Sequence, residues 1–159
     1  MDLDELDKRI LALLQENGKT GYREMAKTLG TNPSTVFNRV RTLENQRVIK
    51  KYSAILDPES LGYDLTAIIF IRANGPHIID IEKELASMSE VMMVYDITGD
   101  YDILVMGKFK NRDELNKFVK KVLAMPNIER TLTNLVLNVI KEDLSLRVER
   151  MPPMADPGQ

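Results

Sequence analysis

Cysteine is absent from the 159-residue sequence, and histidine occurs once, as His77. Without cysteine the chain can form no disulfide, no thiolate zinc site and no cysteine nucleophile. A single histidine, the lack of a phosphate-cradling glycine loop and the lack of a clear metal-ligand spacing argue against catalysis. We therefore predict that the protein is not an enzyme and that it has no catalytic residue, no metal site and no cofactor.

Long hydrophobic runs are also absent. The longest apolar stretches, such as residues 67–71, are far shorter than the roughly 20 residues of a membrane-spanning helix. The N-terminal residues Met-Asp-Leu-Asp-Glu do not resemble a secretory signal. We expect no membrane partner and a cytoplasmic location. The content of 43% hydrophobic and 29% charged residues is typical of one ordinary folded domain or two small ones.

The net charge of −2 conceals an uneven distribution. Residues 18–53 contain eight lysines and arginines against two glutamates, which gives +6 and leaves −8 for the remainder of the chain. A basic segment joined to an acidic remainder indicates that the basic segment alone meets a polyanion. A locally basic, solvated surface would give the same count, so charge leaves both interpretations open.

Residues 3–45 predict three short helices in tandem. The first has apolar residues at helical spacing and stops at Gly18; the second covers residues 22–29 and stops at Gly30. A third helix opens at residues 31–34, where Thr31 or Asn32 can cap it and Pro33 suits the first turn. The tight turn between the second and third helices is typical of a helix-turn-helix.

The third predicted helix carries the strongest indication of function. Val36, Val40 and Leu43 form its apolar stripe, because successive residues advance by about 100°. The opposite face carries short hydroxyl, amide and guanidinium groups and no acid: Ser34, Asn38, Arg41 and Asn45, flanked by Thr35, Arg39 and Thr42. Such groups read base edges in the major groove. The sequence favours a recognition helix over an ordinary surface helix.

Residues 48–56 are β-prone and end at the turn-forming Asp57-Pro58 pair. We predict a linker strand here, following a winged-type helix-turn-helix. Lys50 and Lys51 can contact phosphates beside the groove, or can be solvated lysines of the linker.

The period changes after residue 63. We predict strands at residues 65–72, 91–98, 103–110 and 130–141, with helices over the apolar periods at residues 78–88 and 115–122. This order predicts an α+β fold with a ferredoxin-like βαββαβ domain. The predicted domains are residues 1–50 (helix-turn-helix), 51–63 (linker strand and turn), 64–142 (ferredoxin-like) and 143–159 (C-terminal tail).

The strands at residues 65–72 and 103–109 are apolar on both alternating sides, with Ile68 and Phe70 opposite Ile69 and Ile71. Two helices cover one face of an antiparallel sheet, and the open face is normally polar. We therefore predict that a second copy of the sheet covers the open face in a two-fold dimer.

The chain resembles the Lrp/AsnC (feast/famine) family of transcription regulators from about residue 3 to about residue 142. The resemblance depends on residues 3–11, on the segment from Ser34 to Val40, on the Gly-Asp-Tyr-Asp turn and on Thr131-Leu132-Thr133. It implies a sequence-specific regulator of double-stranded DNA that forms dimers through its C-terminal sheet, and then octamers or similar assemblies.

The resemblance also implies a small amino-acid effector bound between dimers. The implied effector residues are Gly99, Asp100, Tyr101 and Asp102 in the turn, with Thr131 and Thr133 from a neighbouring subunit. From spacing alone, the turn is simply a good hairpin turn and the threonines are ordinary strand residues.

Two alternatives remain at this point. The protein could be an architectural DNA-binding protein without an effector, or an enzyme on the same architecture, such as a tetrapyrrole decarboxylase. The proline-rich residues 151–159 indicate a flexible C-terminal tail, or a segment that lies across a neighbour in the assembly.

Overall fold

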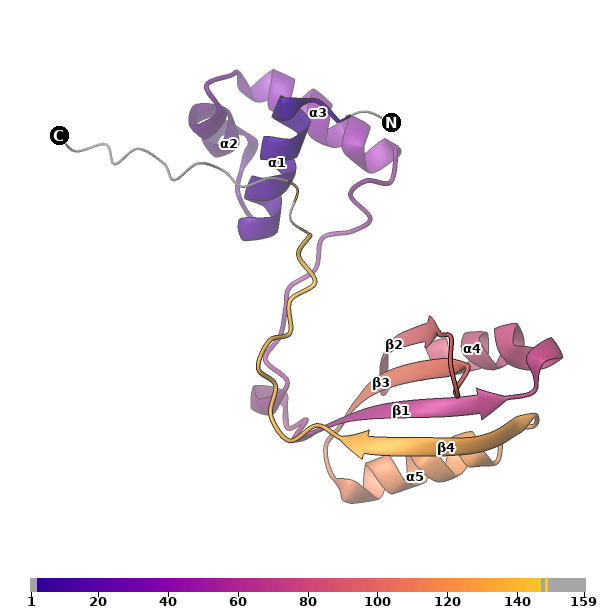
Figure 1. The fold of residues 1–159 in the computed structure, drawn as a ribbon. Helices are drawn as coiled ribbons and strands as arrows, with labels where there is room; N and C mark the ends of the chain where they lie inside the picture. Colours follow the sequence, from indigo (N-terminus) through magenta and orange to yellow (C-terminus); the bar gives the residue numbers. More distant parts are fainter. Residues whose placement is uncertain (1–2, 147, 149–159) are drawn as a thin grey trace. The chain divides into compact units, whose positions relative to one another are not determined.

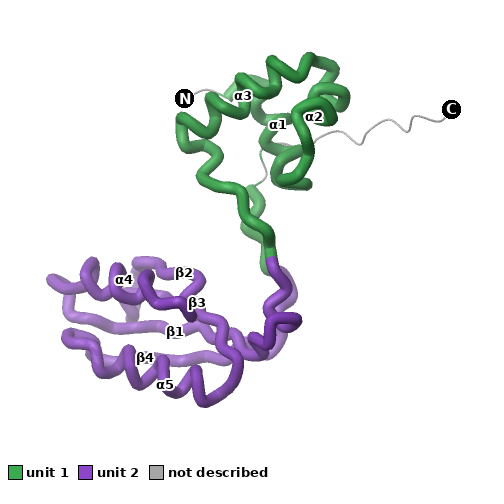
Figure 2. The backbone as a smooth tube through the Cα atoms, turned by 180° about the vertical axis from the view of Figure 1, so that it is seen from behind, with its two compact units in different colours: residues 1–55, 142–159 green, residues 56–141 purple. Residues whose placement is uncertain are grey.

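The computed structural model describes residues 3–146 and 148, and the chain forms two compact units. The first unit combines residues 1–55 with the segment that starts at Glu142, and the second comprises residues 56–141. Figure 2 shows these units in green and purple. The body of residues 56–141 is thus inserted between two parts of the first unit, which we call the head.

Residues 3–55 of the head contain three helices, α1 (Glu5–Glu16), α2 (Tyr22–Leu29) and α3 (Pro33–Asn45) (Figure 1). Asp4 caps α1 in a reciprocal pair with Asp7, so two otherwise unsatisfied amides find acceptors. Gly30 ends α2 in the left-handed region, at φ 66°. Asn32 caps α3, and a proline occupies its first turn, as predicted.

The core of the head is formed by one stripe from each helix. Its fully buried side chains include Ile10 of α1, Met25 of α2, and Val36, Val40 and Leu43 of α3. The apolar stripe predicted for the third helix is therefore confirmed. Because this stripe packs against α1 and α2, the opposite side of α3 is left to solvent.

The predicted linker strand is wrong for the isolated chain. Residues 50–57 are neither helix nor strand, and no wing follows α3 in the described residues. A β-prone sequence becomes a strand only where a neighbouring strand accepts and donates its backbone hydrogen bonds. Ile55 and Leu56 are 96% and 65% exposed, so the apolar side chains of this segment also lack a covering layer.

The predicted C-terminal tail begins at residue 143, and its first residues contact the head. The Gln15 side chain of α1 donates to the Leu146 carbonyl over 2.7 Å and accepts from the Leu146 amide over 2.6 Å. Val148 packs against the core of the head. The Gln15 amide thus bonds both backbone groups of Leu146, as a neighbouring β-strand would. We call the described residues 142–146 and 148 the return segment. The remainder of the predicted tail lies outside the described residues.

Residues 56–141 fold into a four-stranded antiparallel sheet in the order β2-β3-β1-β4. The strands are β1 (Leu65–Ala73), β2 (Val91–Asp96), β3 (Ile103–Phe109) and β4 (Ile128–Leu135). The longer helices are α4 (Ile78–Ala86) and α5 (Arg112–Leu123), and short 3₁₀ turns cover Glu59–Leu61 and Gly75–His77. The predicted α+β, ferredoxin-like fold is confirmed (Figure 1).

One face of the sheet forms the core of the body. Ala67, Ile69 and Ile71 of β1 are fully buried with Leu85 of α4 and Val122 of α5. Alternate residues of β1 lie on the other face, which we call the open face. Strand β4 ends at Leu135, six residues before the predicted boundary, because its last pairing partner is Ala67 near the start of β1. Within the described residues, no helix is long and apolar enough to cross a membrane.

Candidate nucleic-acid interface and effector region

The outer face of α3 presents the predicted base-reading side chains to solvent. Ser34, Asn38, Arg41 and Asn45 are all exposed. They lie opposite the buried stripe of α3 and include no acid, so the face offers hydrogen-bond donors and acceptors beside one guanidinium group. Thr42 is also exposed, and its hydroxyl donates to the Asn38 carbonyl over 2.9 Å.

The hydroxyl groups at the start of α3 are held by its cap. The Asn32 side-chain oxygen accepts from the Thr35 amide at 2.8 Å, from the Thr35 hydroxyl at 2.9 Å and from the Ser34 hydroxyl at 2.7 Å. Each hydroxyl donates inward, so its oxygen remains an acceptor. The cap therefore fixes the first turn, which in a helix-turn-helix approaches base edges.

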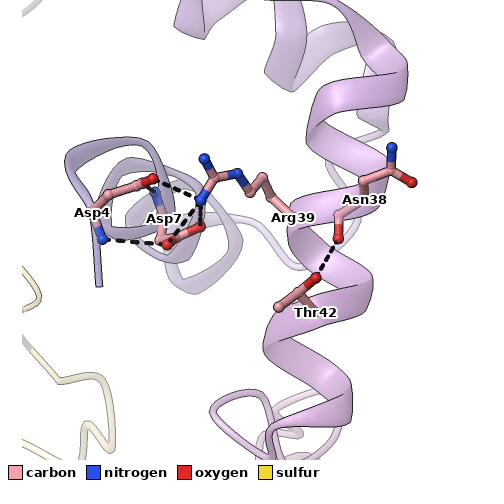
Figure 3. A network of polar contacts seen from close by, with 5 residues as sticks. All are labelled: Asp4, Asp7, Asn38, Arg39 and Thr42. Atoms are coloured by element: carbon pink, nitrogen blue, oxygen red, sulfur yellow. Dashed lines mark hydrogen bonds and ion pairs between the residues drawn. The ribbon is translucent and has the colours of Figure 1, made fainter. Parts of the chain in front are cut away.

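Arg39, which we predicted to bind DNA, has ion-pair partners inside the head. Its guanidinium group lies 2.6 Å from the Asp4 carboxylate and 3.3 Å from the Asp7 carboxylate, both on the N-terminal side of α1. Figure 3 shows Arg39 reaching toward α1 while Asn38 points to the other side of α3. The difference follows from helix geometry: Arg39 lies about 100° beyond Asn38 around the axis. We call this contact the Arg39 clamp.

The clamp and the helix cap act on the same carboxylate. The pKa of Asp4 lies below its ordinary value, chiefly because the Asp7 amide donates to it and further because Arg39 lies beside it. The Asp7 side chain is only 12% exposed and has the Arg39 guanidinium as its cation. The structure therefore gives Arg39 a role in joining α3 to α1.

The segment after α3 brings Lys50 and Lys51 to the surface, as predicted for phosphate contacts. Beside them, the Tyr52 hydroxyl donates to the Glu44 carboxylate over 2.9 Å. Burial and this carboxylate raise the pKa of Tyr52 to about 12. Glu44, the one acidic residue of α3, is thus bound to a tyrosine at the edge of the base-reading face.

Sequence reasoning missed two aromatic rings beside this face. Phe37 of α3 is 43% exposed and Tyr22, the first residue of α2, is 40% exposed. Their ring centroids lie 5.5 Å apart, with an interplanar angle of 82°. The indication available in the sequence was a phenylalanine placed outside the apolar stripe, three positions after Ser34 and four before Arg41.

In the body, the predicted effector turn joins β2 to β3. Gly99 and Asp100 are exposed, and Gly99 has a φ of +122°, which side-chain-bearing residues rarely adopt. Asp102 closes the turn: its carbonyl accepts from the Ile97 amide over 2.8 Å, and its carboxylate accepts from the Ala73 amide over 2.9 Å. Asp100 is therefore the more accessible acid of the turn.

Tyr101 lies on the open face. Its ring contacts the Phe70 ring at 5.7 Å, and the Arg130 guanidinium lies 4.9 Å from its centroid. Thr131 and Thr133 pair with Ile71 and Ile69, and residues directly opposite in a ladder share a face, so both threonines lie on the helix-covered face. One chain therefore does not bring the threonines to Tyr101. Arg130 is a cation that sequence reasoning did not identify.

The open face is apolar, as predicted. Ile68 and Phe70 of β1 are only partly buried and pair with Met106 and Leu104 of β3. Leu132 of β4 pairs with Phe70 and is 45% exposed. Among the described residues, no group of three or more histidines, aspartates and glutamates could hold a metal ion.

A helix-turn-helix head with a basic segment at residues 18–53 and a ferredoxin-like body define a class, that of transcriptional regulators with a ligand-binding domain. Family models match both parts: the AsnC-type helix-turn-helix domain over residues 3–44 and the Lrp/AsnC ligand binding domain over residues 66–146. The chain belongs to the Lrp/AsnC family of helix-turn-helix transcriptional regulators. Its curated relatives are regulators, so the enzyme alternative does not hold.

The relatives match nearly the whole chain. A helix-turn-helix transcriptional regulator of Pyrococcus horikoshii is 47% identical over 146 residues, which is 92% of this chain and 99% of that protein. A transcriptional regulator from Neisseria meningitidis, solved in complex with L-Met, has a TM-score of 0.86 and 28% identity, covering 91% of this chain and 96% of its own. The feast or famine regulatory protein from M. tuberculosis, solved with L-methionine, has a TM-score of 0.85 and 27% identity, covering 91% and 99%.

Proposed function

We propose that this regulator binds specific sequences of double-stranded DNA through the outer face of α3. The observation that carries the proposal is the exposed, acid-free set of Ser34, Asn38, Arg41 and Asn45 on the second helix of the helix-turn-helix. Arginine pairs with guanine and asparagine with adenine in the major groove. Lys50 and Lys51 supply contacts to phosphates, which give affinity without sequence preference.

The test is a binding titration with duplex DNA from upstream of its own gene and with a scrambled duplex of the same composition. Arg41→Ala and Asn38→Ala should each reduce the preference for the specific duplex, by about 1–3 kcal/mol per lost base contact. Lys50→Ala should weaken binding to both duplexes equally. If neither Arg41→Ala nor Asn38→Ala changes the preference, the assignment of the base-reading face is wrong.

We further propose that the open faces of two bodies pack together in a dimer and that dimers assemble further. Support comes from the partly exposed apolar set on this face, which includes Phe70, Leu104 and Leu132. A two-fold dimer would also present two α3 helices to half-sites about one helical turn apart. Leu132→Glu should shift the protein toward monomers in size-exclusion chromatography with light scattering.

Leu123→Glu is the matched control, because Leu123 is 49% exposed on α5 and lies outside the proposed interface. It should leave the assembly unchanged. Equal dissociation by both variants would refute the choice of interface.

The effector we propose is a small amino acid bound between dimers, and L-methionine is the first to test because two solved relatives contain it. Asp100 is exposed and could pair with the ammonium group, while Arg130 could pair with the carboxylate. Thr131 and Thr133 would have to come from a neighbouring subunit, since they lie on the other face of their own sheet from Tyr101.

Calorimetry with each of the twenty amino acids tests this part directly. Asp100→Asn should weaken binding of the active amino acid, and Thr98→Ala, also exposed before the turn, serves as its control. If no amino acid changes thermal stability, assembly size or DNA affinity, the protein is an architectural DNA-binding protein without an amino-acid effector.

A further inference from the structure

We infer that Phe37 reads a thymine, by packing against its C5-methyl group in the major groove. This inference rests on the proposed DNA-binding function and adds an apolar contact to the hydrogen-bonding set on α3. It starts from the exposure of an apolar ring, because 43% of the Phe37 surface is open to solvent. When bound DNA covers the Phe37 ring, this apolar surface is removed from water, which favours binding.

The position of Phe37 on α3 places it among the base-reading residues. It is the fifth residue of the helix that starts at Pro33, and in a helix-turn-helix the N-terminal residues of the second helix approach base edges. Arg41 follows one turn later and Asn38 is the next residue, so all three side chains lie on adjoining sectors of the helix. Phe37 lies on the flank of α3, between the buried stripe of Val36 and Val40 and the sector of Arg41 and Asn38.

The ring of Tyr22 supports Phe37 from α2. The two rings meet nearly perpendicular, at 82°, with centroids 5.5 Å apart, in the edge-to-face geometry that aromatic pairs prefer. Neither ring belongs to the buried core cluster of the head. Tyr22 is therefore a positioning residue: it limits the rotamers of Phe37 and leaves the exposed part of the ring free for a partner.

The chemistry of the partner follows from what the groove offers. Among the four bases, thymine alone presents a methyl group in the major groove, and phenylalanine is one of the side chains that contact it. Arginine and the amides on this face select purines by hydrogen bonds, but none of them recognises a thymine. Phe37 would supply that discrimination.

The geometry also limits where the thymine lies. Phe37 and Arg41 are four residues apart, or about 6 Å along the helix axis, and base pairs are spaced by about 3.4 Å. The thymine read by Phe37 should therefore lie within two base pairs of the position read by Arg41.

The experiment removes the methyl group from the DNA and leaves the folded protein unchanged. Duplexes that bind the full-length protein are first selected from a random library, and each thymine of the selected site is then replaced by deoxyuridine. For the wild-type protein, replacing the contacted thymine in one half-site should weaken binding about fourfold, which corresponds to about 0.8 kcal/mol for one buried methyl group. That thymine should lie within two base pairs of the position whose selectivity Arg41→Ala relaxes.

The same duplexes are then measured with protein variants. Phe37→Ala should bind the thymine and deoxyuridine duplexes equally, Phe37→Leu should retain part of the difference, and Tyr22→Phe should retain all of it because the supporting ring remains. A merely structural role for Phe37 would lower affinity for every duplex and leave the ratio between thymine and deoxyuridine unchanged.

Two results would overturn the inference, and they are distinguishable from failure of the proposed function. The inference is wrong if the selected site shows no sensitivity to deoxyuridine, or if Phe37→Ala keeps the wild-type sensitivity. If the wild-type protein selects no common sequence at all, the proposed sequence-specific function fails, and the inference with it.

Discussion

Replacing Arg39 with alanine separates a structural role from a DNA-binding role at one position. The substitution removes the guanidinium group that lies 2.6 Å from Asp4 and 3.3 Å from Asp7. The Asp4 carboxylate is 48% exposed, so solvent screens its interaction with Arg39. Loss of the partner of a buried charge costs about 3–5 kcal/mol, and Asp7, at 12% exposure, approaches that situation.

We therefore expect Arg39→Ala to destabilise the contact between α1 and α3 by about 2 kcal/mol, less than for a fully buried charge because Asp7 keeps some contact with solvent. Hydrogen exchange measured by mass spectrometry provides a local readout in the full chain. A loss of about 2 kcal/mol in the free energy of opening accelerates exchange of the α1 amides by about thirtyfold. Amides of β1 and β3, in the other compact unit, should exchange at the wild-type rate.

The DNA titration supplies the second readout. A side chain that neutralises one phosphate changes the slope of log affinity against log salt by about one. Arg39→Ala should leave this slope unchanged, whereas Lys50→Ala should reduce it by about one. The reasoning about the clamp is refuted if Arg39→Ala reduces the salt slope and leaves exchange in α1 unaltered.

Three further changes test other features of the structure. Asp4 has a folded-state pKa below its ordinary value of 3.8, so its contribution to stability is complete above that pH and is lost as pH falls through the folded-state pKa. The urea midpoint should therefore drop as pH falls below 3.8, and less so in Asp4→Asn, which keeps a capping side chain. Gly99→Ala should lower the free energy of unfolding by about 1–3 kcal/mol, because alanine is strained at φ +122°. Gly75 has a negative φ and open space around it, so Gly75→Ala should leave the free energy of unfolding unchanged. Equal losses for the two variants in chemical denaturation would contradict the argument. Gln15→Ala should accelerate exchange of the Leu146 amide without changing exchange in β1, and wild-type protection of that amide would show that the return segment is held by other contacts.

The sequence predicted those features that depend on periodicity and local chemistry. A cap at Thr31 or Asn32, the stop at Gly30 and the order of strands and helices along the body could be read from single segments, because each depends on residues near it in the sequence. The apolar open face was also predictable, since alternation along β1 exposes its composition directly.

What could not be predicted depends on contacts between segments far apart in the chain. Arg39 was assigned to DNA because its residue type suits phosphates, and only the fold shows Asp4 and Asp7 within reach of it. Phe37 was not assigned a function because the sequence alone does not distinguish an exposed aromatic residue from one in the core. The residues before Leu56 have the composition of a strand. A strand also needs a neighbouring strand to pair with its backbone amides and carbonyls, and composition does not reveal whether one is present.

The return segment bears on the order in which the protein is made. Helices α1 to α3 leave the ribosome first, yet Leu146, which pairs with Gln15, and Val148, which packs on the helix core, are synthesised only after the whole sheet. A nascent head can therefore form its helical core early but acquires its last contacts after the body has been translated. Completion of the DNA-binding unit is thereby tied to synthesis of the domain that would sense the effector.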